Sequence, residues 1–504
     1  MARNPTTKSQ VQAYQFVLRR MQSALVRKDA VMLHEPMRTH LRAAAVGLII
    51  GVLGCAGFFV FGLFSPDDDL SGSDIVVGKQ SGAIYVVQQE PFRLIPVRNL
   101  ASARLLLAAL PDRGAAAGPA EVKVVEDASL GDASRAPLTG IEGAPAYLPG
   151  PDRRVPVEWA VCDRASLDDA LPNPEASPEI TTTALIGLPR PGRELAADEA
   201  LLVESSTGDN YLVRDGKRGP VDLSDSAVTE AYQLGGIVPR EISVGLLNAI
   251  PEGDALNPPV VPGVGEPSSF PQLAGVAVGD VVQVNLAGRE SFYLILRDGQ
   301  QAVARAVADL IRFDRSPSTD FTEISPEAIA EVPPAPQGSR LDFGDFPSQV
   351  PRIVETPDAE SACLAWRIVD GDQRTAITVS GAELPLPEGK RPVEIPGQDG
   401  SGDSLDSVFL PPSRGALVRG VVPGQEPGTG SIFLVTDQGL KYGVPSMEVA
   451  QALGLGETTD PAPEAILGLL PDGPPLEPQD ALELYDPGLA AQRQQELTGS
   501  GGGG

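Results

Sequence analysis

The sequence predicts an α+β protein with a single transmembrane helix, followed by an elongated extracytoplasmic domain of four small β-hairpin/helix repeats around a disulfide-stapled, β-rich central domain. Three observations predict this. One run of 22 residues has no charged side chain, a strand–turn–strand pattern recurs four times after it, and the two cysteines of the outer region lie in separate inserts between those copies.

The charge of the 504-residue chain is divided unevenly. Its 39 Lys and Arg against 67 Asp and Glu give a net charge of −28, but residues 1–42 carry +6 and residues 65–504 carry −34. So acidic an outer region would repel a phosphate backbone, which excludes a nucleic-acid partner. Hydrophobic residues make up 42% of the chain, enough for a sizeable folded core.

The inner segment predicts a basic amphipathic helix, which a capping box at Thr7-Lys8-Ser9-Gln10 would start. Apolar side chains then follow at alternating spacings of three and four, with Arg19 and Arg20 beside them: Val11, Tyr14, Leu18, Met21 and Leu25. Such a helix either lies on anionic lipid headgroups or docks on a partner protein. We favour the partner, because the inner segment has no folded domain of its own against which these side chains could pack.

Residues 43–64 are the charge-free run. About 20 helical residues span the hydrocarbon core of a bilayer, so this run predicts a transmembrane helix rather than a buried helix of a soluble protein. Basic residues precede the run and Asp67, Asp68 and Asp69 follow it, which predicts a cytoplasmic amino terminus and an extracytoplasmic carboxy-terminal domain. A cleaved signal peptide, the alternative, would have a shorter apolar region and a small-residue cleavage site.

Cys162 and Cys363 are the only cysteines outside the predicted span, because Cys55 lies within it. Their surroundings mirror each other, with Trp159 three residues before Cys162 and Trp366 three residues after Cys363. In an oxidising compartment this pair predicts a disulfide bond, and two free buried thiols are the alternative. The bond would close a loop of about 200 residues, which the chain-entropy model values at roughly 4–5 kcal/mol.

A strand–turn–strand pattern recurs at residues 82–97, 208–221, 291–307 and 430–444. Its turn dipeptides are Asp215-Gly216, Asp298-Gly299 and the weaker Gln438-Gly439. A first strand is expected before each copy, at 75–77, 200–204, 281–285 and 417–422, and a helix after it, at 100–110, 226–233, 304–312 and 446–453. Each unit would then be a three-stranded sheet with one helix against it.

Two long inserts separate the copies, and each insert holds one member of the cysteine pair. Both inserts are therefore expected to build one central domain. The predicted organisation is a cytoplasmic helix (1–42), a transmembrane helix (43–64), an acidic linker (65–74), a first repeat (75–114), the first insert of the central domain (115–195), a second repeat (196–275), a third repeat (276–334), the second insert of the central domain (335–412), a fourth repeat (413–485) and a tail (486–504).

The outer region offers no residues for common catalytic chemistry. The two histidines, His34 and His40, both precede the predicted span, which excludes Ser-His-Asp catalysis and histidine-ligated zinc beyond it. No G-x-x-x-x-G-K-[ST] motif is present, and a calcium-loop-like start at Asp67 has Gly78 instead of Glu at its twelfth position. We expect no catalytic residue, no cofactor and no metal ligand.

Several segments, in order along the chain, resemble one family. They include QVQAYQFVLRRM (10–21), NLASARLL (99–106), WAVCD (159–163), DGKRGPVDLSDSAV (215–228) and GSIFLVTDQGLKYGV (430–444). These segments resemble the EccB family, the single-pass membrane component of actinobacterial type VII (ESX) secretion systems. The resemblance covers residues 8–485; Glu142 stands where the family has proline, and residues 497–504 look like an appended glycine-rich linker.

The resemblance implies a structural and assembly subunit of the secretion core complex in the inner (plasma) membrane. Its carboxy-terminal domain would be periplasmic and would self-associate above the pore. The partners that it implies are an EccC-type motor ATPase of the FtsK/SpoIIIE class, EccD, EccE, the mycosin protease, other EccB copies and the cell wall. The alternative is a membrane-anchored ATPase or hydrolase of the same system, since the family carries an ATPase label. Under that alternative ATP would be bound, as the family label implies. The missing P-loop argues against it.

Overall fold

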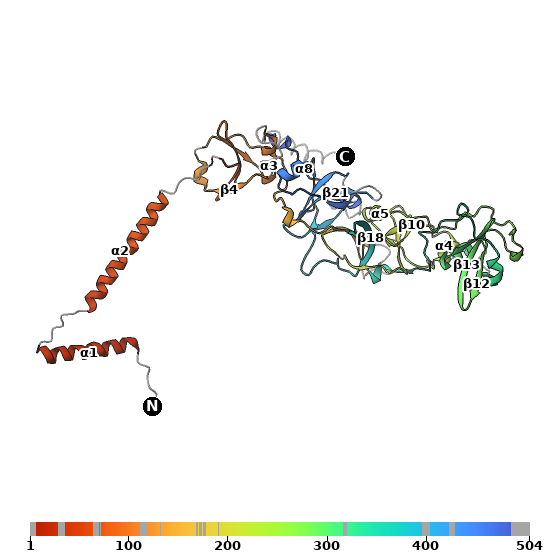
Figure 1. Ribbon diagram of the computed structural model, residues 1–504, viewed down its shortest axis with the longest axis horizontal. Helices are drawn as coiled ribbons and strands as arrows, with labels where there is room; N and C mark the ends of the chain where they lie inside the picture. The colour runs from red at the N-terminus through yellow and green to blue at the C-terminus, as the bar shows by residue number, and fades with distance from the viewer. Residues whose placement is uncertain are drawn as a thin grey trace, which may run out of the picture. The chain divides into compact units, whose positions relative to one another are not determined.

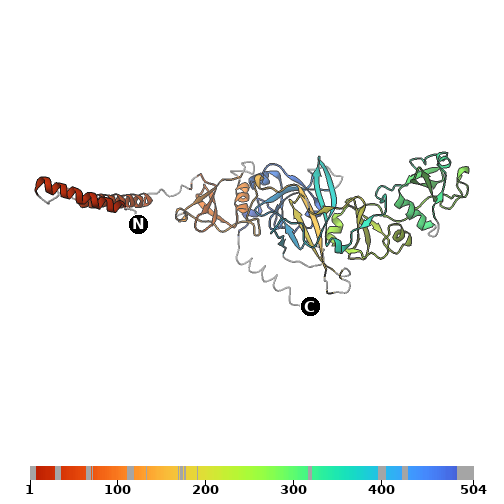
Figure 2. The same cartoon turned by 90° about the horizontal axis from the view of Figure 1, so that it is seen from below.

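The computed structural model describes residues 7–28, 36–63, 70, 72–110, 119–131, 133–167, 170, 174, 178–189, 191–315, 320–395, 404–422 and 429–484. The chain forms two compact units, Met1–Asp69 and Leu70–Gly504. The first contains helices, and the second contains small β-sheets with short helices (Figures 1 and 2). The protein is therefore of mixed α+β class, with one long apolar helix, several small sheets and one disulfide bond among the described residues.

The first unit contains helices α1 (Lys8–Arg27) and α2 (Pro36–Leu63). The predicted capping box starts α1: the Gln10 amide donates to Thr7 Oγ1 at 3.4 Å, and the Thr7 amide donates to Gln10 Oε1 at 3.0 Å. Within α2, Thr39–Val60 is long and apolar enough to cross a membrane. The helix begins seven residues before the predicted span, at a proline, which suits a first turn because the amide there needs no partner. Phe64 lies outside the described residues.

Four sheets of the second unit share one strand order, in which three antiparallel strands are followed by a fourth that lies parallel to the first. The first sheet contains β1 (Ile75–Gly78), β2 (Ile84–Gln88), β3 (Arg93–Val97) and β4 (Val122–Val125), with α3 (Leu100–Ala109). The second contains β8 (Glu199–Glu204), β9 (Asn210–Arg214), β10 (Lys217–Val221) and β11 (Arg240–Glu241), with α4 (Ser226–Ala231) and α5 (Val244–Ala249); β16 (Arg352–Ile353) also pairs with β8.

The third sheet contains β12 (Val281–Leu286), β13 (Arg289–Leu296), β14 (Gly299–Val303) and β15 (Thr322–Glu323), with α6 (Arg305–Arg315) and α7 (Pro326–Ala330). The fourth contains β21 (Gly415–Val421), β22 (Ile432–Thr436), β23 (Lys441–Val444) and β24 (Asp460–Pro463), with α8 (Met447–Ala452) and α9 (Glu464–Leu467).

The prediction of three-stranded units is wrong, because each of these sheets has a fourth strand. The added strands are short: β11 and β15 have two residues each, and β24 contains two prolines among its four residues. So short a segment has no alternation of apolar and polar residues to reveal it, and pairing with the first strand fixes its conformation. Of the strands that pair with these sheets, β4 lies within residues 115–195 and β16 within 335–412, the two predicted inserts.

The turn of the third hairpin lies one residue earlier than predicted. Leu296 pairs with Gly299, so Arg297 and Asp298 form the turn and Gly299 begins β14. A Cβ atom on Gly299 would lie 2.5 Å from the Pro333 carbonyl oxygen. Close approach of another backbone, rather than turn geometry, therefore requires glycine at this position.

The fifth sheet has the order β19-β20-β6-β5-β17-β18-β7 and is called the central sheet below. Both inserts contribute to it: β5 (Glu158–Ser166), β6 (Glu179–Ile186) and β7 (Arg193–Glu194) come from the first, and β17 (Ser361–Val369), β18 (Asp372–Ser380), β19 (Val393–Glu394) and β20 (Ser407–Phe409) from the second. The middle strand, β5, pairs with β17, and the two come from segments about two hundred residues apart in sequence.

Shared hydrophobic cores join the small sheets in pairs. Buried side chains of the first and fourth sheets form one core, in which α3 contacts α8. Buried side chains of the second sheet and of α6, the helix of the third sheet, form another, in which α4 contacts α6. A third and larger core joins the central sheet to the second and fourth sheets.

The hairpin turns of the second and fourth sheets dock on the central sheet through glycines. Gly216 has φ +74°, and a Cβ atom on it would lie 2.8 Å from the Thr375 carbonyl oxygen in β18. Gly439 has φ +79°, and a Cβ atom on it would lie 3.0 Å from Val408 Cβ in β20. The two contacts lie towards opposite edges of the central sheet, so each pair of small sheets is held by its own hairpin.

We predict that Gly216→Ala destabilises the second unit by about 2–4 kcal/mol, because it combines left-handed backbone strain with overpacking against β18. Gly236→Ala is the matched control: its φ is +84°, but a Cβ atom there has no neighbour within 4 Å. The control should therefore cost only about 1 kcal/mol of strain. Urea unfolding of the full chain in detergent, followed by tryptophan fluorescence, measures both; equal losses would contradict the docking contact.

Candidate functional site

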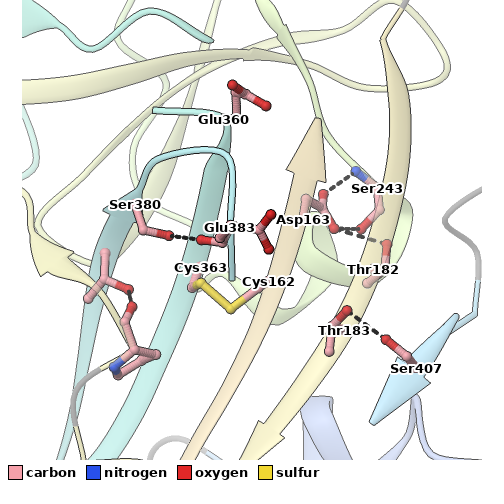
Figure 3. The surroundings of a disulfide bond; sticks show 12 residues. Cys162, Asp163, Thr182, Thr183, Ser243, Glu360, Cys363, Ser380, Glu383 and Ser407 are labelled. Carbon is pink, nitrogen blue, oxygen red and sulfur yellow. Dashed lines mark hydrogen bonds between the residues drawn. A yellow bond between two sulfur atoms is a disulfide. The ribbon is translucent and has the colours of Figure 1, made fainter. Parts of the chain in front are cut away.

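The centre of the second unit is a disulfide bond between paired strands (Figure 3). In the register of β5 and β17, Cys162 lies opposite Cys363 and Trp159 lies opposite Trp366. The cysteine Cα atoms are 4.0 Å apart, and both side chains are buried. An antiparallel partner runs in reverse, which explains why the order Trp-Ala-Val-Cys is mirrored as Cys-Leu-Ala-Trp.

The two faces of this strand pair have different surroundings, because successive side chains on a strand point to opposite faces. The disulfide lies on one face with Leu185 and Phe409, against Leu384 and Leu386. Val161 and both tryptophans belong to the large core on the other face. Both faces are therefore covered by apolar side chains.

A buried carboxyl group follows the first cysteine directly. Asp163 is 2% exposed and accepts three hydrogen bonds: from the Ser243 amide at 2.7 Å, from Ser243 Oγ at 2.8 Å and from Thr182 Oγ1 at 2.9 Å (Figure 3). Burial raises the pKa of Asp163 to about 6, although these hydrogen bonds and the charge of Arg240 oppose the rise. Ser243 is also the N-cap of α5, so Asp163 fixes the start of that helix on the central sheet.

Two further buried charges connect strands. The Arg240 guanidinium, on β11, donates to the carbonyl oxygens of Ala359 and Glu360, and burial lowers its pKa to about 10. Glu199, at the start of β8, forms ion pairs with Arg193 of β7 and Arg352 of β16. The hydrogen bond from Arg193 is the main reason that the pKa of Glu199 is lowered.

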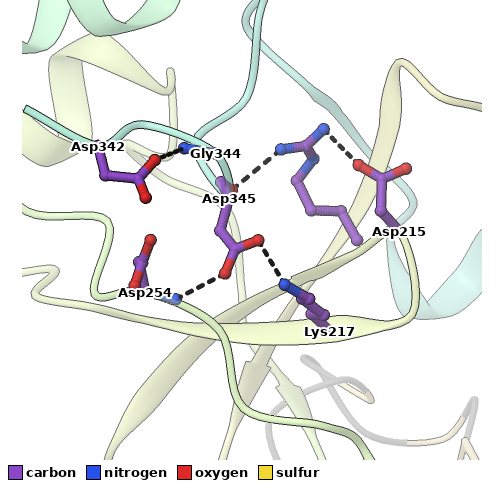
Figure 4. A network of polar contacts seen from close by, with 7 residues as sticks. Asp215, Lys217, Asp254, Asp342, Gly344 and Asp345 are labelled. Atoms are coloured by element: carbon purple, nitrogen blue, oxygen red, sulfur yellow. Dashed lines mark hydrogen bonds and ion pairs between the residues drawn. The ribbon is translucent and has the colours of Figure 1, made fainter. Parts of the chain in front are cut away.

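Another carboxylate contact fastens the chain that returns from the third sheet (Figure 4). Asp345 accepts from Lys217 Nζ at 2.6 Å and from the Asp254 amide at 3.1 Å, and its carbonyl oxygen accepts from Arg214 Nη1 at 3.2 Å. The hydrogen bond from Lys217 lowers the pKa of Asp345. The segment around Asp345 is thereby fixed to the β9–β10 hairpin.

These polar groups serve as connectors between strands. Within the described residues, no group of three or more His, Cys, Asp or Glu side chains could hold a metal ion. An open groove beside the central sheet is lined mainly by apolar side chains, among them Leu364, Trp366, Pro461 and Ile466.

The predicted docking residues of the inner helix all lie on α1, and their apolar members are exposed: Val11, Tyr14, Leu18, Met21 and Leu25. Arg19 and Arg20 are exposed between them. The exposed apolar surface is wider than predicted, because it also includes Phe16, Val17 and Val26. A strict 3-4 spacing excludes these three positions, whereas a count of apolar residues around the whole helix would have found them.

Comparison with known proteins gives one consistent result. The chain matches the family model of the type VII secretion system ESX-1, transport transmembrane domain B, over residues 3–488. It is 35% identical over 495 residues to the ESX-3 secretion system ATPase EccB3 of Mycolicibacterium smegmatis, covering 95% of this chain and 91% of that protein. It is 31% identical over 499 residues to the ESX-5 secretion system ATPase EccB5 of Mycobacterium marinum, covering 95% and 94%.

Solved structures agree with the sequence matches. A chain of an intact ESX-5 inner membrane complex is similar to this protein with a TM-score of 0.68 and 29% identity, over 96% of this chain and 97% of that chain. The EccB3 dimer from the ESX-3 core complex is similar with a TM-score of 0.68 and 31% identity, over 82% of this chain and 100% of that chain.

We predict that Cys162→Ser lowers the stability of the second unit by about 2–5 kcal/mol, because the bond closes a loop of about two hundred residues. Cys55→Ser is the control, since Cys55 is a free and exposed cysteine of α2. Urea unfolding measures both variants, and mass mapping without reductant measures the bond itself. Alkylation of both Cys162 and Cys363 in the unreduced protein would contradict the prediction.

Proposed function

The chain belongs to the EccB family and is a component of the type VII (ESX) secretion core complex, and we propose that it acts there as a structural and assembly subunit. The observation that supports this role is the connectivity of the second unit. The central sheet joins both pairs of small sheets, and the buried charges at its edges link strands to one another.

We propose that the four small sheets are copies of one repeat, arranged around the central domain. Their common strand order supports this, as does the recurrence of a helix after the third strand of each. The first repeat then extends beyond residue 114 to include β4, and the second recruits β16. The remaining borders stay as the sequence predicts them.

The proposed topology places the amino terminus in the cytoplasm and the second unit in the periplasm. The charge division supports it, since +6 precedes the apolar helix and −34 follows it. A disulfide bond in the second unit agrees with an oxidising compartment.

The proposed partners are other copies of this chain, an EccC-type motor, EccD, EccE and the mycosin protease. The similarity to chains of ESX inner membrane complexes and to an EccB3 dimer supports partners in the membrane and self-association. The exposed apolar side chains of α1 offer a docking surface for a cytoplasmic partner.

The relatives carry the word ATPase in their names, but we propose that this chain does not hydrolyse ATP itself. A tagged full-length chain, purified in detergent from its membrane, should bring a P-loop motor and a many-span subunit with it. ATP turnover should disappear when the motor's P-loop lysine is replaced. Turnover that persists in the chain purified free of the motor would support the enzyme instead.

We predict that Leu18→Asp detaches the cytoplasmic partner and stops secretion, because it places a charge within the exposed apolar stripe of α1. Gln12→Asp is the control, because Gln12 lies about 120° around the same helix from Leu18 and outside the predicted stripe, and it should keep the complex. Native gels of detergent extracts measure the complex, and carbonate extraction measures membrane insertion. Insertion should be normal in both variants, and an intact complex with Leu18→Asp would argue against docking through this surface.

We predict that the acidic second unit associates only weakly with its own copies at low salt. Residues 65–504 carry −34, so copies repel each other in solution, and salt screens this repulsion over about 8–10 Å. A fragment spanning residues 70–490 should therefore be mainly monomeric at micromolar concentration and low salt, and should form more dimer as salt rises. Sedimentation across a salt series measures this. A dimer that is tight at low salt and dissociates at high salt would mean that attractive charge pairs hold the contact.

A further inference from the structure

The seam between the second sheet and the central sheet contains a titratable group at its middle. On one side of this seam lie β11 and α5, and on the other lie β5 and β17, which α5 contacts. Figure 3 shows Asp163 between Ser243, from the first side, and Thr182 of β6. Apolar side chains from both sides fill the seam, among them Ile242 and Leu246 against Ala362. Asp163 is the carboxyl group in this seam, and it crosses from β5 to Ser243.

We propose that Asp163 is a proton-operated latch, which holds the second sheet closed on the central sheet when it is protonated and lets this seam open more readily when it is ionised. Burial is the physical reason, because a neutral carboxyl group costs less to keep out of water than a carboxylate. Opening of the seam would return Asp163 to water, where the ionised form is well solvated.

No ion pair stabilises the ionised form of Asp163 among the described residues. Its three hydrogen-bond donors are neutral groups, from Ser243 and Thr182. Arg240 is the positive charge that acts on it, but the guanidinium donates its own hydrogen bonds to the Ala359 and Glu360 carbonyl oxygens. Among the described residues, the carboxylate is therefore stabilised by a positive charge only at a distance, without an ion-pair contact.

Other charged groups lie near the seam. Glu360, ahead of β17, acts on Arg240, and Asp406, ahead of β20, accepts from the Thr182 amide at 2.7 Å. Glu241, the exposed residue after Arg240 on β11, points away from the seam, and burial and the nearby Glu204 raise its pKa. Histidine cannot contribute in the second unit, because His34 and His40 are the only two in the chain. A change between pH 5 and 8 in this seam therefore points to Asp163, with Glu241 as its competitor among the described residues.

The direction in which pH changes the closure of the seam follows from the two pKa values of Asp163. The pKa of Asp163 is about 6 in the closed seam and falls to about 4 when the group is solvated. Protons therefore bind the closed form more tightly, and closure is favoured at low pH and weakened as pH rises through 6. From these two values the opening constant should rise about tenfold between pH 5 and pH 8.

Hydrogen exchange of the full chain in detergent tests the latch, with rates corrected for the intrinsic effect of pH. Peptides that cover β11 and α5 should show about tenfold more opening at pH 8 than at pH 5. Asp163→Asn should remove this dependence, whereas Glu241→Gln should keep it. Asp209→Asn, at an exposed turn of the second sheet, is the control for a lost negative charge.

A second variant keeps the test decisive if Asp163→Asn fails to fold. Thr182→Val removes one donor from the carboxylate and leaves the titrating group in place. It should raise the midpoint of the pH dependence in the same peptides. The latch would be overturned by opening that is independent of pH in the unaltered chain, by opening that falls as pH rises, or by a dependence that Glu241→Gln abolishes.

Discussion

The antiparallel pairing of β5 with β17 is the contact on which the second unit depends. It joins two segments that lie about two hundred residues apart, and the disulfide makes this pairing covalent. Everything between the two strands, including the second and third sheets, forms one closed loop on this pair. The bond lowers the conformational entropy of the unfolded chain, and this effect grows with the length of the loop that the bond closes. The disulfide therefore stabilises the folded second unit, although that unit contains many turns.

Four short strands bury little apolar surface by themselves, so the small sheets pack against helices and against one another. The first sheet shares a core with the fourth, and the second shares one with α6, the helix of the third. The pairs are then fixed to the central sheet by the hairpin glycines Gly216 and Gly439, where a larger residue would meet the neighbouring strand. Packing between sheets, rather than the stability of any one sheet, thus sets the architecture.

The sequence revealed the elements that have a strong local signal. The 22-residue apolar run, the capping box at Thr7, the turn at Asp215-Gly216 and the mirrored Cys/Trp spacing each follow from local chemistry or spacing, and the structure has the corresponding helix, turn and strand pair. The fourth strands were missed because two residues such as Arg240-Glu241 have no periodicity. Asp163 was missed for another reason: it resembles an ordinary polar residue after a strand core, and only tertiary packing makes it buried.

The position of Asp163 directly after Cys162 gives the strand β5 two different connections. Successive side chains alternate between faces, so the cysteine bonds on one face of the central sheet and the carboxyl group reaches the large core on the other. The first connection is covalent and insensitive to pH, whereas the second consists of hydrogen bonds to a group that titrates. Because the disulfide fixes β5 against β17 whatever the state of Asp163, protonation can alter the seam with the second sheet while the central sheet keeps its register. The rigid connection and the adjustable one therefore come from two consecutive residues of one strand.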